Sequence, residues 1–111
     1  MLYIGNAFSL NMLNVNGVTT LKVKELSNDE AISLLSNNEF NSVIGHASTA
    51  EYVTLLTGIQ VSANRVSVTL KPEDKLLVIQ LLGRLPEGVI LTTEEVAKVP
   101  SKWYLVTVSD S

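Results

Sequence analysis

The pattern of hydrophobic and polar residues predicts a series of short β-strands. Residues 18–26 (VTTLKVKEL) and 65–70 (RVSVTL) alternate with a period of two, which is typical of strands with one face in water. Residues 41–45 (NSVIG) and 75–83 (KLLVIQLLG) are more continuously hydrophobic, as expected of buried strands. Further strands are predicted at 2–6 and 103–108. The turn-forming KPED at 71–74 is expected to join 65–70 and 75–83 as a hairpin.

Helix-start signals interrupt these strands at three places. Each is a Ser or Thr followed three residues later by Glu, the pattern of a capping box. Hydrophobic residues continue at helical spacing after the first two signals, and those helices are expected to end near residues 37–38 and at Gly58. The three pairs are Ser27 with Glu30, Ser48 with Glu51, and Thr92 with Glu95.

The order of these elements predicts a single α/β domain over residues 1–111, with a mixed β-sheet of about five strands flanked by helices. The length of 111 residues suits one domain with its own core. A hydrophobic share of 46% with 17% charged residues is that of a globular chain rather than a disordered one.

Composition and charge exclude several classes of function. The chain has no Cys and one His, so disulfides, thiolate chemistry and zinc–thiolate sites are excluded, and no cluster of carboxylates has metal-ligand spacing. We therefore expect no metal and no cofactor. The net charge of −3 argues against binding of long nucleic acids, but a small anionic ligand needs only a local set of donors. No hydrophobic run reaches membrane-spanning length and the opening lacks a signal peptide, so a soluble cytoplasmic protein is expected.

His46 is the first candidate for catalysis. It follows the predicted strand 41–45 and precedes a predicted helix, the kind of turn in which α/β proteins bind anions. Histidine exchanges protons near neutral pH and could act there as a general acid. A lone histidine in a turn is, however, more often a structural hydrogen-bonding residue, so its position alone leaves both interpretations open.

Two loops and two cations add further candidates. Arg65 and Arg84 are the only arginines and the strongest candidates for fixed positive charges on a phosphate. Arg84 and Glu87 share a turn, although a solvated Pro-Gly turn would look the same. After the first strand, residues 6–11 offer neutral donors and acceptors that are also ordinary loop formers: Asn6, Ser9 and Asn11.

Four segments together resemble a known family. They are NAFSLNML at 6–13, IGHASTAEYVTLLTG at 44–58, NRVSV at 64–68 and GRLPEGVILTTEEV at 83–96. In order and spacing they are similar to the small viral anti-CRISPR ring nucleases of type III systems, which are found in archaeal viruses and phages. The similarity extends over nearly the whole chain, and it implies a homodimeric α/β protein with a mixed sheet.

The resemblance also implies a substrate and a mechanism. Members of that family bind cyclic tetra-adenylate in a pocket across the homodimer interface and cleave it without metal to linear di-adenylate. His46 matches the general acid that protonates the leaving 5′ oxygen while the ribose 2′-OH attacks phosphorus in line. Glu87 matches the glutamate that supports this histidine, and Arg84 the arginine near the scissile phosphate. Other positions match ligand contacts: Asn6, Ser9, Asn11, Arg65 and Gln80.

Two alternatives stay open at this point. One is a protein that binds and sequesters a cyclic oligonucleotide without cleaving it. The other is a viral factor that acts by binding another protein, in which the polar residues have no catalytic role.

Overall fold

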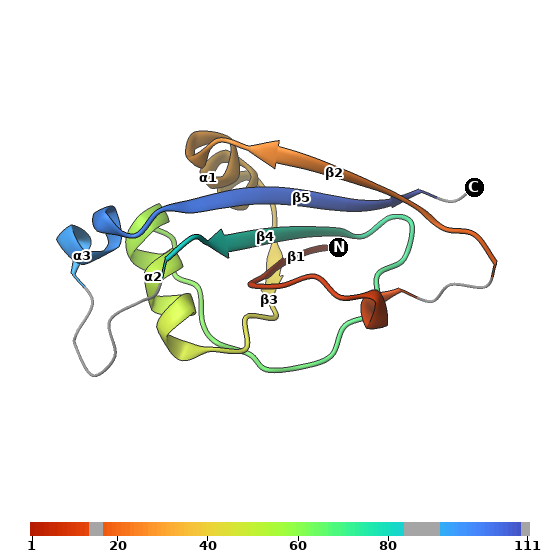
Figure 1. Ribbon diagram of the computed structural model, residues 1–111, viewed down its shortest axis with the longest axis horizontal. Coiled ribbons are helices and arrows are strands. Elements are labelled where there is room, and N and C mark those ends of the chain that lie inside the picture. Colours follow the sequence, from red (N-terminus) through yellow and green to blue (C-terminus); the bar gives the residue numbers. More distant parts are fainter. Residues whose placement is uncertain (14–16, 84–91, 110–111) are drawn as a thin grey trace.

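The computed structural model describes residues 1–13, 17–83 and 92–109. Its centre is a five-stranded sheet with the strand order β2-β5-β4-β1-β3 (Figure 1). This arrangement confirms the predicted α/β class and the mixed sheet of about five strands. Along the described chain the elements are β1 (Leu2–Gly5), the 3-10 helix η1 (Leu10–Met12), β2 (Thr20–Leu26), α1 (Asn28–Asn37), β3 (Phe40–Ser42), α2 (Ala47–Thr57), β4 (Lys75–Leu81), α3 (Thr93–Lys98) and β5 (Ser101–Ser109).

Strand direction decides which loops meet. β1 is parallel to both of its neighbours, β3 and β4, whereas β5 is antiparallel to β4 and β2. The carboxyl ends of β1, β3 and β4 therefore lie at one edge of the sheet. In α/β proteins this edge is where ligands bind, because the loops that follow parallel strands converge there.

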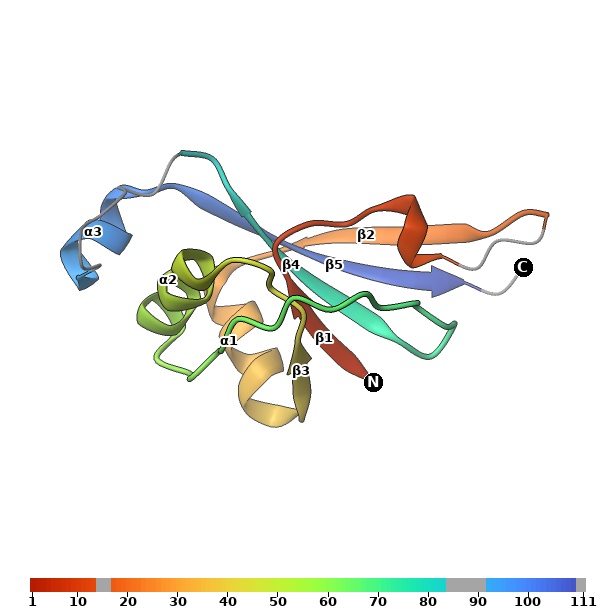
Figure 2. The same ribbon diagram turned by 90° about the horizontal axis from the view of Figure 1, so that it is seen from below.

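The two faces of the sheet are covered differently. Figure 2 shows α1 and α2 on one side and η1 on the other. The helix side holds the main core, in which Tyr52 and Val53 of α2 pack against the sheet; its other fully buried members include Ile4, Ala31, Ile44, Leu77 and Ile79. On the other side a smaller cluster forms between the sheet and the loops, with Leu70, Leu76, Val78 and Val106 at its centre.

The second side is only partly covered. Phe8 and Met12 pack against the cluster of Leu70, Leu76, Val78 and Val106, but β2 and β5 extend beyond the helices (Figure 1) and keep hydrophobic side chains accessible. Val23 is 61% exposed. We call this region the open face. It comprises Leu21 and Val23 of β2 with Tyr104 and Val108 of β5. In the register of the two strands, Leu21 lies opposite Val108, Val23 opposite Val106, and Tyr104 opposite Glu25.

Local sequence signals account for most helix ends. Ser27 and Glu30 form the predicted capping box, with reciprocal bonds of 3.1 and 3.0 Å. The backbone N–H of Ser27, followed by its side chain, holds the pKa of the Glu30 carboxyl below its usual value. The Thr92 hydroxyl accepts from the Glu95 N–H at the start of α3, and α2 ends at Gly58 with a φ of 74° that favours glycine.

The predicted capping box of Ser48 and Glu51 is wrong. α2 begins two residues earlier than that signal requires, at Ala47, and His46 occupies the N-cap position without a side-chain cap bond. Ser48 therefore lies inside the first turn. The burial of Tyr52 and Val53 against the sheet sets where this helix starts, and packing of that kind outweighs the modest contribution of a local cap.

The predicted strand at 65–70 and its hairpin are also wrong. β4 pairs with β1 on one side and β5 on the other, so neither edge of β4 is left for a hairpin partner. Residues 60–69 instead cross the molecule without regular structure, and Leu70 makes a single bridge to Leu13. The alternation in this segment does not mark a buried face, since Val66 is 53% exposed.

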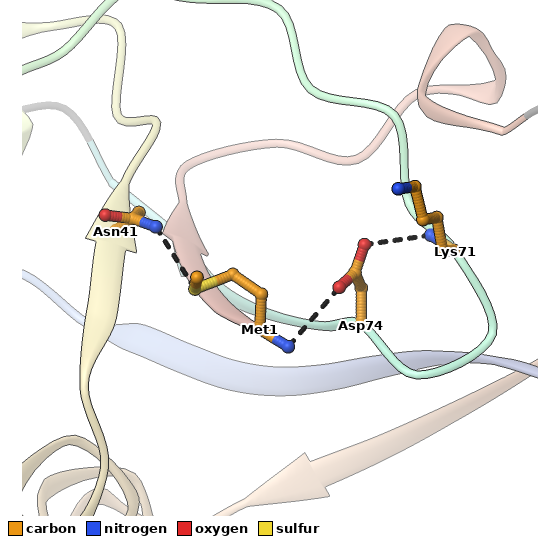
Figure 3. Close-up of polar contacts among 4 residues, drawn as sticks. All are labelled: Met1, Asn41, Lys71 and Asp74. Carbon is orange, nitrogen blue, oxygen red and sulfur yellow. Dashed lines mark hydrogen bonds and ion pairs between the residues drawn. The ribbon is translucent and has the colours of Figure 1, made fainter.

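The KPED turn is confirmed, and its aspartate links the amino ends of the parallel strands β1 and β4 (Figure 3). Asp74 Oδ2 accepts from the Lys71 backbone N–H at 3.0 Å, and Oδ1 lies 3.3 Å from the terminal amine of Met1. The Asn41 amide contacts Met1 Sδ at 3.1 Å. The Asp74 side chain is only 8% exposed, so its charge depends on these partners rather than on water.

Replacing Asp74 with Ala is expected to lower the free energy of unfolding by about 1–3 kcal/mol, because it removes a charge-assisted acceptor from two donors. Glu73 precedes it in the same turn and is exposed, so Glu73→Ala should change stability by less than about 0.5 kcal/mol. Urea unfolding followed by circular dichroism measures both variants. Equal stabilities for the two would show that Asp74 contributes nothing to the fold.

Candidate functional site

His46 lies at the corner between β3 and α2. Its backbone is extended, with φ −126° and ψ 128°, and its carbonyl accepts the Ala50 N–H at 3.1 Å as the first bond of α2. The side chain is exposed, and no described residue forms a hydrogen bond with the imidazole. The ring is therefore accessible to a ligand at the amino end of the helix and is not part of the core.

The backbone in front of His46 is held firmly. The Val43 N–H donates to the Ile4 carbonyl at 2.8 Å, and the Ile44 N–H donates to the Ser42 hydroxyl at 3.3 Å. Ile44 itself is completely buried in the main core. An accessible imidazole thus follows directly after an anchored segment, which limits how far the ring can move.

Asn6 reaches this corner from the neighbouring strand. It follows β1, and its Oδ1 accepts the Gly45 N–H at 3.4 Å. The two strand exits approach closely because Gly5 has no side chain: a Cβ at that position would lie 3.2 Å from Cγ2 of Val43. The parallel pairing of β1 and β3 therefore brings Asn6 beside the residue that precedes His46.

Arg65 approaches the same corner from the irregular segment 60–69. A Cβ built on Gly45 would lie 3.6 Å from Cγ of Arg65, so the hydrocarbon part of the arginine crosses the backbone next to His46. The Arg65 side chain is exposed and has no ion-pair partner among the described residues. Its guanidinium is available to an anion at this corner.

The amino end of α2 adds to the positive potential. The helix has 11 residues, no side-chain cap and no acidic residue in its first turn. Its first backbone N–H groups therefore carry the positive end of the helix dipole without a carboxylate to neutralise it. Together with Arg65 and the Asn6 amide, these groups form a donor-rich corner suited to a phosphate.

The other predicted ligand contacts lie further from the imidazole. Ser9 and Asn11 are exposed at η1, where the Ser9 hydroxyl accepts the Asn11 N–H at 3.1 Å. Gln80 is exposed near the carboxyl end of β4, and its Nε2 donates to the Leu81 carbonyl at 3.4 Å. No described contact joins these three residues to His46, although Gln80 lies at the same edge of the sheet.

Arg84 and Glu87 lie outside the described residues. Their assignment to the scissile phosphate and to the support of His46 therefore stays a prediction. Of the predicted site residues within the described ranges, the structure brings together His46, Asn6 and Arg65.

Sequence reasoning missed Asn64. Its backbone N–H donates to the Ile44 carbonyl at 2.8 Å, and its Nδ2 donates to the Ser42 carbonyl at 2.9 Å. These bonds fasten segment 60–69 to the strand exit that leads to His46. No local pattern distinguishes Asn64 from other loop asparagines, because both acceptors lie about twenty residues earlier in the chain.

Within the described ranges, a metal-binding cluster and a membrane-spanning helix are both absent. No group of three His, Asp or Glu side chains there is placed to hold a metal ion. In the same residues, none of the helices combines the length and the hydrophobicity needed to cross a bilayer.

Comparisons with known proteins give consistent matches. The family model STIV B116-like matches residues 2–103. "Uncharacterized protein 26" of Sulfolobus islandicus filamentous virus is 40% identical over 100 residues, which cover 89% of this chain and 84% of that protein. "Uncharacterized protein YddF" of Bacillus subtilis is 32% identical over 88% of this chain and 93% of its own length. The structure of B116 from Sulfolobus turreted icosahedral virus superposes with a TM-score of 0.80 at 30% identity, covering 96% of this chain and 97% of B116.

Proposed function

This chain belongs to the STIV B116-like family, and we propose that it is a metal-independent ring nuclease that binds cyclic tetra-adenylate and cleaves it to linear di-adenylate, thereby blocking type III CRISPR signalling. The observation that carries the proposal is the accessible imidazole of His46 at an uncapped helix amino end, beside Arg65, which has no ion-pair partner among the described residues. The resemblance of the four sequence segments to viral ring nucleases supplies the substrate.

The chemistry needs little from the protein. RNA carries its own nucleophile: the ribose 2′-OH attacks the adjacent phosphorus and releases its proton to water, and the bond from phosphorus to the 5′ oxygen breaks as the new bond to the 2′ oxygen forms. The product ends in a 2′,3′-cyclic phosphate. His46 in its protonated form gives a proton to the departing 5′ oxygen. The rest of the site has to align the ring and stabilise the added negative charge, which requires donors and cations but no metal.

The described donors fit those tasks. Arg65 is positioned to neutralise a phosphate next to His46, and Asn6 and the first N–H groups of α2 offer neutral hydrogen bonds. Few charges suffice because the ligand is small and can be enclosed, so the overall net charge of −3 is no obstacle. Arg84 and Glu87 would complete the site by supporting the scissile phosphate and the imidazole.

A homodimer would double this set of donors, and the open face offers a surface for it. Its hydrophobic side chains Leu21, Val23, Tyr104 and Val108 would be covered by the same face of a second copy. The loops that carry Asn6 and Arg65 pack on the same side of the sheet through Phe8 and Leu70. A second copy on the open face would therefore lie next to both loops.

Incubation of the purified protein with radiolabelled cyclic tetra-adenylate tests the proposal. Linear di-adenylate is expected in the presence of Mg²⁺ and equally in excess EDTA, because no step uses a metal. Chromatography of the products over time gives both rates. Bound but intact ligand would instead indicate a sequestering protein, and cleavage that EDTA abolishes would contradict the mechanism.

A further inference from the structure

The segment that carries Arg65 has no secondary structure to hold it. Residues 60–69 run from the end of α2 to the turn before β4, and Arg65 is exposed within them. A long cationic side chain on such a segment would lose considerable conformational entropy on binding a phosphate. A guanidinium that must meet a phosphate at a defined place therefore needs its backbone fixed by other contacts.

Asn64 provides those contacts. Its two bonds, from N to the Ile44 carbonyl and from Nδ2 to the Ser42 carbonyl, bracket the backbone that leads into His46. Arg65 is the next residue, and its Cγ lies over Gly45, between Ile44 and His46. Asn64 thus ties the backbone next to Arg65 to the segment that leads into His46.

We propose that Asn64 is a positioning residue: it holds the Arg65 guanidinium at the His46 corner so that it can bind the phosphate of the cyclic ligand. This rests on the proposed function, since the ligand is the one assigned there. Asn64 itself need not touch the ligand, because both of its described bonds go to backbone carbonyls of the protein.

A double-mutant cycle tests this role. All variants carry His46→Ala so that the ligand stays intact, and calorimetry measures the dissociation constant for cyclic tetra-adenylate. Arg65→Ala is expected to weaken binding about 10- to 100-fold, because it removes a charge-assisted contact. Asn64→Ala should weaken it about three- to tenfold when Arg65 is present and have almost no effect when Arg65 is absent.

Ser62→Ala serves as the matched control, since Ser62 is exposed in the same segment and has no described side-chain bond; its binding should equal that of the parent. Thermal unfolding of every variant separates positioning from stability. The role of Asn64 would be overturned, without affecting the proposed function, by either of two results. One is that Asn64→Ala weakens binding as much in the absence of Arg65 as in its presence, and the other is that it leaves binding unchanged when Arg65 is present. Failure of the His46→Ala parent to bind the ligand would overturn the proposed function, and with it this inference.

Discussion

Replacing His46 with Ala is expected to slow cleavage of cyclic tetra-adenylate by about 100- to 10,000-fold while changing its binding by less than about threefold. The imidazole is exposed and makes no described hydrogen bond, so its removal leaves the corner between β3 and α2 intact. Only the proposed proton donor to the 5′ oxygen is lost. Single-turnover rates with protein in excess, and calorimetry for binding, separate the two quantities.

Glu51→Gln is the control for this variant. Glu51 is exposed on α2 one turn beyond His46, and the structure shows that it does not cap the helix. Its replacement should leave both the rate and the binding unchanged. A His46→Ala protein that cleaves at the parental rate would exclude His46 as the general acid, whatever the behaviour of the control.

Val23→Lys is expected to dissociate the proposed homodimer and, with it, to abolish the proposed cleavage. Val23 lies on the open face, and by symmetry each copy would bring one lysine into the same hydrophobic interface. Burying two unpaired like charges costs several kcal/mol, so the dimer dissociation constant should rise by at least about 100-fold. Sedimentation equilibrium measures the association, and the cleavage assay at the same concentrations measures its consequence.

The same strand offers a matched control. Thr20 is exposed on β2 three residues before Val23, and its side chain points to the opposite face of the sheet. Thr20→Lys adds the same charge to the same strand and should leave dimer and cleavage unaffected. A Val23→Lys protein that still sediments as a dimer would show that the open face is not the interface.

The fold was predictable where the signal is local. The capping box of Ser27 with Glu30 and the glycine end of α2 at Gly58 both depend on a few neighbouring residues, and both predictions are confirmed. The strand at 65–70 failed because strand formation needs a partner, and β4 has already paired with β1 and β5. No pattern within 65–70 contains that information.

In the candidate site, too, local features were predictable from the sequence and long-range contacts were not. The position of His46 between a strand and a helix could be predicted from its flanking residues, and the structure places it there. The approach of Asn6 and Arg65 to Gly45 depends on the parallel pairing of β1 with β3 and on the bonds of Asn64 to residues 42 and 44. These contacts join residues about 20 to 40 positions apart, so they follow from the topology and not from local spacing.

The most direct test of His46 as general acid uses a cyclic tetra-adenylate in which sulfur replaces the bridging 5′ oxygen. A thiolate is a much weaker base than an alkoxide, with a thiol pKa of about 8.5, so this leaving group departs without a donated proton. His46→Ala should therefore cleave the sulfur ligand about as fast as the parental protein does, although it fails on the oxygen ligand. An equally large defect on both ligands would contradict proton donation by His46.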